Sequence, residues 1–533
     1  MGVSTSGDAV RPEGPAARDP LAACTPATAW ACTPGPHDEP RQAVVLIHGL
    51  GDQPPKRSLR SFTWGIGLRR LFSSPDRITD STELRRLSEP PTAHRRAHTD
   101  YFELYWANLA PDSDWRTSAL WMLRLLLRPR WWRTRGAAAR LVVGLQVVLL
   151  AAVLHLAWGV VDAVRDAGAA GLLEAFARWQ VWAGLALTAG GLLVGRFLRT
   201  YLSDAVRYLT PRPANIAARQ AIRDEGLTLL RRLHAGRYRR IIVVGHSLGS
   251  VIGMDLLRCL WDEMRHPDPR IAGDQAGLDA FDVAADRIDP GRQATAVLSH
   301  APNDLAIGVR PSRAVDAAEM DALHAAQFEL WRSQRADGVP WLVTDLVTAG
   351  SPLTYAPLLL DEPPGAFGGR PGLTLAQLQG LKEVPRCPPI HDELTDSRFY
   401  SRRYDLPADG SRWLRVGHTA APFGPTRWTN LYLPASGLWH GDLFGGPLAE
   451  HFGPGVRDVP VRVEGGGVWA SLRRCFPLAH LSYWWRPGGG PDRMPEPVPL
   501  PSGGSGQDPD APPPESVTAL VSAMRLDDIR RAP

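Results

Sequence analysis

The stretch IIVVGHSLG, residues 241–249, decides the fold expected for this chain. Its four leading β-branched residues predict a strand buried on both faces, and the apolar pattern from Leu248 to Met264 predicts a helix directly after it. Gly245 and Gly249 flank Ser247, and they remove side chains that would collide across a sharp strand-to-helix turn. We therefore predict a Ser247 hydroxyl exposed at the end of a parallel strand, with His246 in the same bend.

Backbone amides suited to hold a developing negative charge are expected on two sides of this turn. The amide of Leu248 would lie at the N-terminus of the helix, where backbone N–H groups point toward an anion. The run His48-Gly49-Leu50-Gly51 follows the apolar strand Ala43–Ile47, and its glycines keep the backbone open. We assign the second amide to Leu50 and expect His48 to orient the loop rather than to transfer protons.

A serine hydroxyl is a weak nucleophile at neutral pH and needs a base that is oriented by an acid. On a strand–serine–helix turn the chain order is serine, acid, histidine. We choose His480 as the base because it lies in the last patterned segment of the chain. We choose Asp442 as the acid because it follows the predicted strand 428–433. The other candidates are the bases His391, His418, His440 and His451 and the acids Asp345, Asp392 and Asp458.

Strands and helices alternate along the rest of the chain. Strands are predicted at 101–106, 240–245, 341–349 and 427–433, and helices at 215–234, 248–264 and 319–332. This alternation predicts an α/β fold with a mostly parallel sheet flanked by helices.

Asp345 falls inside one strand, which favours a structural role. The turn at Gly350-Ser351-Pro352 is expected near the site without being a second nucleophile. The acidic segment 272–293 is predicted to be a surface excursion.

An apolar hairpin at 138–200 is expected to interrupt this fold. Leu141–Val161 is a run of 21 uncharged residues, which meets the length needed to span a bilayer as a helix. Trp179–Gly195 adds 17 uncharged residues between Arg178 and Arg196, whose side chains can reach the interfaces. We predict a transmembrane helical hairpin with two spans. The alternative is a buried helical pair inside a soluble domain.

Arginines outside the hairpin predict its orientation. Cytoplasmic flanks of membrane spans carry an excess of Lys and Arg. The outer flanks here are rich in arginine, whereas the loop between the spans carries only Arg165 and Arg178. The arginines of the outer flanks are Arg124, Arg128, Arg130, Arg133, Arg135, Arg140, Arg196, Arg199, Arg207 and Arg212. We therefore expect a multi-pass membrane protein with its catalytic domain on the cytoplasmic side.

Composition sets the remaining boundaries. We predict a disordered leader at 1–40 without a secretory signal, an α/β domain at 41–485, and a Pro/Gly-rich disordered tail at 486–533 with one short helix near 517–529. The balance of 60 Lys and Arg against 55 Asp and Glu is too mild to suggest nucleic-acid binding. Five scattered cysteines show no metal-ligand spacing and favour a reduced compartment. No metal or organic cofactor is expected.

Taken together, these motifs resemble the α/β-hydrolase superfamily, and more narrowly its lipase- and esterase-like members. The resemblance covers roughly 44–485. Within it, the chain looks most like bacterial membrane-associated hydrolases that open with His-Gly and carry an aromatic strand similar to 103–106. It implies a triad of Ser247, Asp442 and His480, with oxyanion donors at Leu50 and Leu248. The matching segments are 48–51, 245–249, 348–352, 428–432 with Asp442, and 480–484.

This resemblance implies cleavage of carboxylic esters through an acyl-enzyme, with small-molecule esters or acyl lipids as substrates. Soluble lipases lack the inserted hairpin, so substrate specificity does not follow from the resemblance.

Two alternatives to an ester hydrolase remain open. One is a catalytically inactive membrane-bound scaffold of the same fold, and the other is an acyltransferase that uses the same triad.

Overall fold

A computed structural model supplies the structure of this chain. It describes residues 40–49, 54–75, 83–89, 97–109, 213–289, 315–361, 372–391, 397–406, 410–436, 440–489, 493–501 and 512–532, with a few isolated positions elsewhere. The predicted leader, apart from Pro40, lies outside these residues. So do the two predicted spans, apart from isolated positions in the first. Among the described residues, no helix is both long and apolar enough to cross a membrane.

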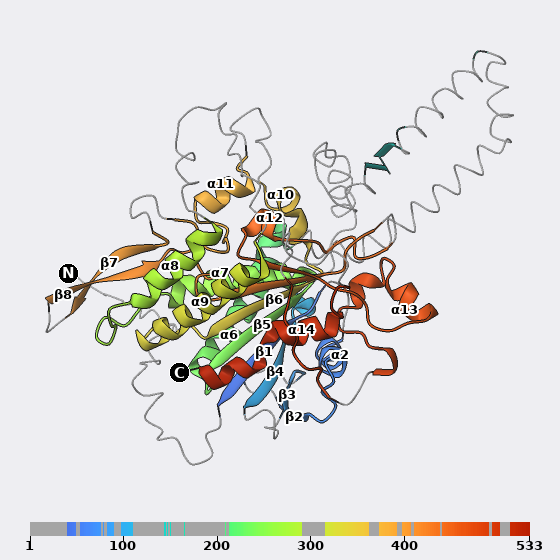
Figure 1. Cartoon of the computed structure of the whole chain (residues 1–533), viewed down its shortest axis with the longest axis horizontal. Coiled ribbons are helices and arrows are strands. Elements are labelled where there is room, and N and C mark those ends of the chain that lie inside the picture. The colour runs from blue at the N-terminus through green and yellow to red at the C-terminus, as the bar shows by residue number, and fades with distance from the viewer. Residues whose placement is uncertain are drawn as a thin grey trace, which may run out of the picture. The chain divides into compact units, whose positions relative to one another are not determined.

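The described residues contain a mostly parallel sheet of eight strands, in the order β10-β9-β6-β5-β1-β4-β3-β2 (Figure 1). The strands from β10 to β4 pair in parallel, whereas β3 and β2 are antiparallel additions at one edge. Their bounds are β1 (Arg41–Ile47), β2 (Phe72–Pro75), β3 (Arg85–Glu89), β4 (His98–Leu104), β5 (Arg240–His246), β6 (Val343–Ala349), β9 (Arg427–Tyr432) and β10 (Arg457–Pro460). The prediction of a mostly parallel α/β sheet is confirmed.

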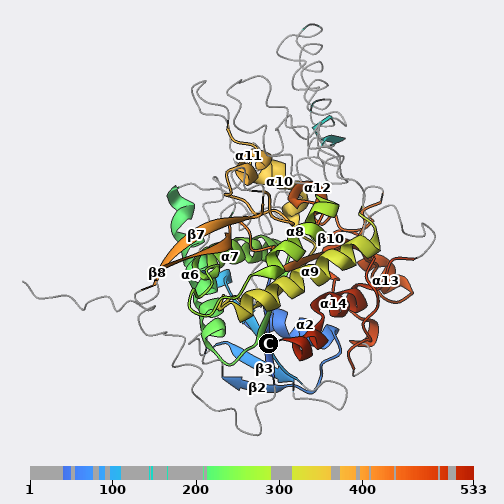
Figure 2. The ribbon, with the colours of Figure 1, turned by 60° about the vertical axis from the view of Figure 1, so that its left-hand side comes forward.

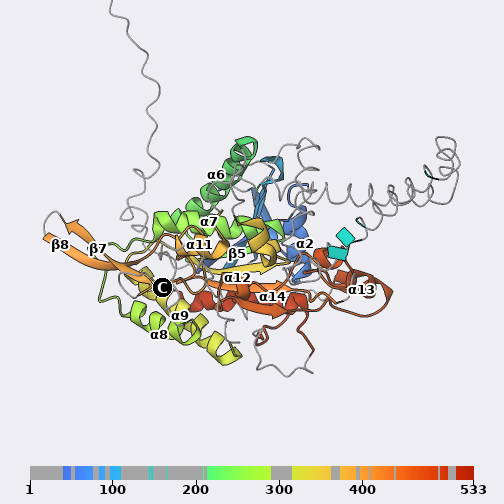
Figure 3. The same ribbon diagram turned by 90° about the horizontal axis from the view of Figure 1, so that it is seen from above.

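Alternate residues of the central strands face two separate apolar cores. Val45 and Val243 pack with α6 (Pro213–Ala235) and α7 (Leu248–Met264). Val44 and Ile242 pack on the opposite face with α2 (Arg57–Gly65) and α14 (Ser516–Met524). Figure 3 shows α7 on one side of the sheet and α14 on the other. Burial on both faces explains why these strands are continuous apolar runs.

Strand β1 sits at the point where the chain changes direction across the sheet. From β1 the chain reaches β4 on one side and later returns to β5 on the other. In open parallel sheets, ligands bind outside the carboxyl ends of the strands at such a switch point. The segments that leave β1 and β5 are those around His48 and Ser247, so the topology brings the two predicted motifs to one edge.

Most of the described part of the acidic segment 272–293, which was predicted to be a surface excursion, is a helix. Helix α8 (Ala276–Ile288) packs against α9 (Ala317–Ala336), and Figure 2 shows the two side by side. Leu278, Phe281 and Ala285 are buried in this contact, because they recur on one helical face between acidic residues. The neighbouring antiparallel hairpin of β7 (Phe399–Leu406) and β8 (Gly410–Gly417) was not predicted.

Short elements connect these layers. They are η1 (Ala107–Leu109), η4 (Pro352–Tyr355), α10 (Ala356–Leu359), α11 (Leu375–Gly380), α12 (Ala449–Phe452), α13 (Val468–Arg473), η5 (Ala479–Leu481), η6 (Pro487–Gly489) and η7 (Leu526–Arg531). Of these, η5 carries His480, the predicted base.

The prediction of a disordered tail from residue 486 is wrong for the last part of the chain. Helix α14 and η7 lie against the sheet, and Val517 and Leu520 are fully buried there. The apolar sequence SVTALVSAM supplies the buried face, which the Pro- and Gly-rich stretch before it obscures at the level of composition. The short helix expected near 517–529 is confirmed.

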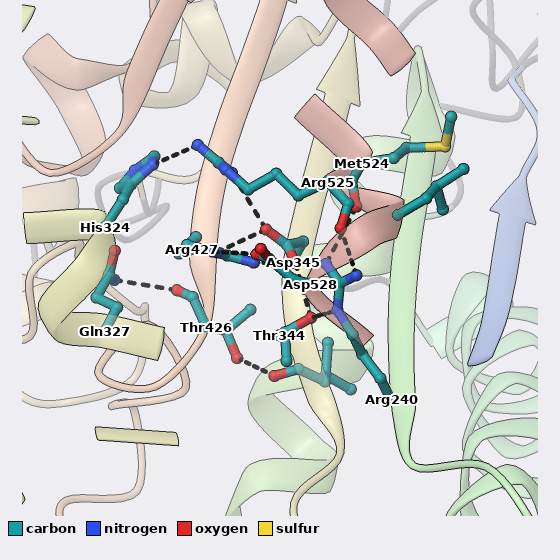
Figure 4. A network of polar contacts seen from close by, with 12 residues as sticks. Arg240, His324, Gln327, Thr344, Asp345, Thr426, Arg427, Met524, Arg525 and Asp528 are labelled. Carbon is teal, nitrogen blue, oxygen red and sulfur yellow. Dashed lines mark hydrogen bonds and ion pairs between the residues drawn. The ribbon is translucent and has the colours of Figure 1, made fainter. Parts of the chain in front are cut away.

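A buried charge cluster ties this terminal segment to the strands (Figure 4). The Asp345 carboxylate on β6 accepts hydrogen bonds from Arg240 at 2.5 Å, Arg427 at 2.8 Å and Arg525 at 3.2 Å. A second carboxylate, Asp528, lies 2.8 Å from Arg427. Burial alone would raise the pKa of Asp345, but the surrounding guanidinium groups hold it well below its ordinary value. The structural role expected for Asp345 is confirmed.

Asp345→Asn should therefore destabilise the fold strongly. Removing this one carboxylate leaves three buried guanidinium groups with too little negative charge, and breaking such a pair costs about 3–5 kcal/mol. Urea unfolding of the full chain measures the effect. Asp405→Asn is the matched control, because that side chain is 83% exposed and pairs with Arg403 on the surface. Equal unfolding midpoints for the two variants would contradict the role of the cluster.

Candidate active site

Ser247 occupies a strained turn between β5 and α7. Its backbone has φ 52° and ψ −125°, a conformation that L-residues rarely adopt and that costs on the order of 1–3 kcal/mol. The flanking glycines are required by close packing. A Cβ atom on Gly245 would lie 2.6 Å from the carbonyl oxygen of Gly249, and one on Gly249 would lie 2.1 Å from that of Ile47.

The structure brings Ser247, His480 and Asp442 into one hydrogen-bonded chain. The Nε2 atom of His480 lies 2.9 Å from the Ser247 Oγ, and its Nδ1 lies 2.9 Å from an Asp442 carboxylate oxygen. A carboxylate only accepts, so Nδ1 carries the proton and Nε2 can accept the proton of the serine. All three side chains are buried or nearly so. This arrangement can activate a serine hydroxyl as a nucleophile.

Asp442 is held as an anion by donors on several sides. Its carboxylate accepts hydrogen bonds from the Tyr483 hydroxyl at 2.8 Å and the Phe444 amide at 2.9 Å, besides the one from His480. Burial by itself would raise the pKa of Asp442, but His480 and these donors outweigh burial and leave the pKa below its ordinary value. Asp442 can therefore remain ionised while it orients His480.

Tyr483 is a site residue that the sequence analysis missed. Its hydroxyl donates to Asp442 and accepts the amide of Leu433 at 3.2 Å, so it fixes the acid relative to the end of β9. It lies three residues after His480 in the segment that suggested the base. That proximity was the available signal, but only the fold shows that Tyr483 reaches the acid.

The turn after β6 packs directly against this acid. Gly350 has φ +59°, and a Cβ atom there would lie 2.9 Å from Asp442 and 2.7 Å from the ring of Tyr483. The hydroxyl of Ser351 lies 2.6 Å from that of Ser250, in the first turn of α7. The turn expected near the site thus packs beside Asp442. Ser351 supports the glycine-flanked turn between β5 and α7 that carries Ser247, which is called the elbow below.

The rival acids and bases contact other groups. Asp458 accepts the amides of Leu448 and Ala449, which lie where α12 begins, and burial raises its pKa to about 6. Asp392 lies outside the described residues. Among the rival bases, His391 binds Asp286 and His451 lies 3.0 Å from the carbonyl oxygen of Thr354.

The oxyanion side of the site is described in part. Leu248 is the first residue of α7, and the first amides of a helix have no acceptor within it. Leu50 lies outside the described residues, but Gly49 beside it is close to the elbow: a Cβ atom on Gly49 would lie 2.9 Å from the Ser247 Cβ. The loop after β1 therefore passes directly beside the serine.

His48 holds this loop in place. Its ring stacks on Trp106, with centroids 5.0 Å apart, and accepts the Trp106 amide at 3.4 Å. Its other nitrogen donates to the carbonyl oxygen of Gly49 at 2.8 Å. Burial lowers the pKa of His48 to about 4, so the ring is neutral at physiological pH. These contacts support an orienting role.

His246 positions the backbone of the candidate base. Its Nε2 donates to the carbonyl oxygen of His480 at 2.8 Å, and its ring meets the edge of Trp484 with centroids 4.9 Å apart. Burial, and to a smaller extent the neighbouring His480, lower the pKa of His246 to about 3. A neutral His246 thus links the elbow to the segment that delivers His480.

Glu103 anchors the backbone that leads into α2. It lies in the buried part of β4 and accepts the amide of Lys56, the residue directly before α2, at 2.7 Å. Lys56 adopts a left-handed conformation with φ 71°, so this bond holds a strained position. Burial raises the pKa of Glu103 to about 7, although the backbone amides of Lys56 and Leu59 donate to it and oppose this rise.

The comparisons with known proteins identify no relative: no protein-family model matches the chain, and no curated protein or solved structure is significantly similar to it. Within the described residues, no group of three or more His, Cys, Asp or Glu side chains is arranged to hold a metal ion.

Tyr483→Phe should slow covalent labelling of Ser247 by a fluorophosphonate about tenfold, because one hydrogen bond to an ionised group is lost. It should also shift the acidic limb of the labelling profile to higher pH, because the ionised Asp442 loses a donor and its pKa rises. Tyr238→Phe is the matched control, since its hydroxyl bonds the buried Asp100 at 2.7 Å away from the site. Identical pH profiles in both variants would refute the positioning role.

Glu103→Gln tests the anchor through its pH dependence. The folded pKa of Glu103, about 7, lies above the ordinary value of 4.5. Between these values the folded chain binds more protons than the unfolded chain, so stability falls as pH rises through about 7. The amide titrates nowhere in this range. The melting temperature of the wild type should therefore drop more than that of the variant between pH 5 and pH 8, and equal drops would contradict the assignment.

Proposed function

We propose that this chain has the α/β-hydrolase fold and cleaves carboxylic esters through an acyl-enzyme. The observation that carries the proposal is the hydrogen-bonded chain from Ser247 through His480 to Asp442, with both links at 2.9 Å. The order of these residues along the sequence and the glycine-flanked turn are those of serine hydrolases with a nucleophile elbow.

The mechanism follows from the atoms of this chain. The Ser247 oxygen attacks the ester carbonyl carbon while His480 takes its proton, and Asp442 stabilises the imidazolium that forms. The amide of Leu248, together with that proposed for Leu50, would bind the oxyanion. His480 then returns the proton to the leaving alcohol. Water attacks the acyl-enzyme by the same route and releases the carboxylic acid.

The strain at Ser247 favours an enzyme over an inactive scaffold. A turn with φ 52° costs free energy in a residue other than glycine, and such strain persists where it serves a function. A scaffold would gain nothing from a serine in this conformation. It would also have no use for an imidazole held between a serine hydroxyl and a carboxylate.

A membrane location is part of the proposal and rests on the sequence. The two uncharged runs within 138–200 and the arginines around them support a hairpin of two spans with the hydrolase domain on the cytoplasmic side. That location makes acyl lipids the expected substrate class.

Ser247→Ala should abolish turnover of short p-nitrophenyl esters, with a loss of at least about 10⁴-fold, because loss of the nucleophile removes the covalent route. The folded state should survive, since an alanine methyl group fits where the serine hydroxymethyl group stands. Ser401→Ala on the exposed face of β7 is the matched control and should keep full activity. Retained turnover in a folded Ser247→Ala protein would overturn the proposal.

A further inference from the structure

A pocket lies beside the candidate site. It has a volume of about 320 Å³ and borders α2 and the segment that follows His480. Neither Ser247 nor His480 lines it. Trp484 connects the two places, because it lines the pocket and also contacts His246. The side chains that give the pocket its character are Trp64, Arg473, Leu481, Trp484, Trp485 and Arg486.

The pocket carries positive charge that the described residues only partly neutralise. Arg486 is almost fully buried and donates from Nε to Glu464 at 2.8 Å, but its Nη1 has no hydrogen-bond partner among the described residues. Arg473 lies over the ring of Trp485 at 4.6 Å and donates to Ser482 at 3.3 Å, and it makes no salt bridge in the described part. None of the described residues that line the pocket carries a carboxylate.

A buried guanidinium group with an unused donor favours an anion. Unpaired buried donors are costly, and arginine binds phosphate and carboxylate oxygens with a pair of parallel hydrogen bonds. Arg473 and Arg486 both line this pocket, so a single oxyanion group could use donors from each. The aromatic side chains beside the arginines would strengthen these bonds by lowering the local dielectric constant.

The rim of the pocket is apolar and exposed. Trp64 and Leu481 are half-exposed, at 50% and 46%. Next to them, α13 and the residues after it expose four more large apolar side chains, Val468, Trp469, Leu472 and Leu478. The sequence between Gly465 and Trp485 contains no acidic residue. A cluster of exposed apolar side chains around a cationic pocket is typical of a surface that meets an anionic amphiphile.

We propose that this pocket binds the phosphate of an anionic phospholipid at Arg473 and Arg486, while the acyl chains lie along Trp64, Leu481 and the exposed side of α13. The charge of the pocket is complementary to the headgroup, and its rim is complementary to the chains. The binding itself is independent of catalysis. Such a lipid would also be an ester substrate of Ser247, and this second step rests on the function proposed above.

Binding is measured on the full chain carrying Ser247→Ala, in a neutral detergent, by titration calorimetry. The probes are dihexanoylphosphatidic acid, dihexanoylglycerol and inorganic phosphate. The phosphatidic acid should bind saturably, and at least about tenfold more tightly than either dihexanoylglycerol or inorganic phosphate. Because this variant cannot turn over, a failure of the ester chemistry and a failure of the pocket give different results.

Arg473→Gln should weaken binding of the phosphatidic acid about tenfold or more, because a charge-assisted hydrogen bond is lost. Arg474→Gln is the matched control: it removes the same charge from the next residue, whose side chain bonds the Gly465 carbonyl oxygen and does not line the pocket. Trp64→Ala should also weaken binding, whereas Trp413→Ala on the exposed face of β8 should not. Circular dichroism checks that each variant is folded.

Three outcomes would overturn the proposal. Equal losses in the two arginine variants would mean that general surface charge attracts the lipid. Equal affinity for inorganic phosphate would mean a free-anion site without a lipid chain. Equal affinity for dihexanoylglycerol would mean an apolar surface without headgroup recognition.

Discussion

The backbone of Ser247, held at φ 52° between β5 and α7, is the constraint on which the rest of the site depends. A strained turn of this kind persists only where its surroundings leave no alternative. Here β5 is buried on both faces and α7 packs closely against β1, so neither side of the turn can relax. The hydroxyl is presented because the two elements that flank it cannot move.

The partners of that hydroxyl come from distant parts of the chain and are assembled by the sheet. Asp442 follows β9 and His480 follows β10, and both strands extend the parallel sheet beyond β6. Tyr483 and His246 then fix the acid and the base through backbone and side-chain bonds. The cluster around Asp345 joins β5, β6 and β9 near their other ends, and Arg525, directly after α14, completes it.

Local signals predicted the elbow, because glycine spacing and strand-to-helix periodicity are properties of a short segment. The chain order of serine, acid and histidine left several rivals open. Asp442 was chosen because it follows a predicted strand, and His480 because it lies in the last patterned segment. Tyr483, Glu103 and the cluster of Asp345 with Arg525 were beyond prediction, since each depends on which strands become neighbours. Composition misled at α8 and α14, where a narrow apolar face lies within acidic or Pro-rich surroundings. The predicted spans and Leu50 lie outside the described residues.

Peptide mass mapping after fluorophosphonate treatment tests the central claim most directly, because it reports which atom of the folded chain is nucleophilic without assuming a substrate. A single adduct on Ser247 that disappears in His480→Ala is the result expected from a serine activated by this imidazole. An adduct on another residue, or labelling of Ser247 that persists unchanged in His480→Ala, would contradict the account.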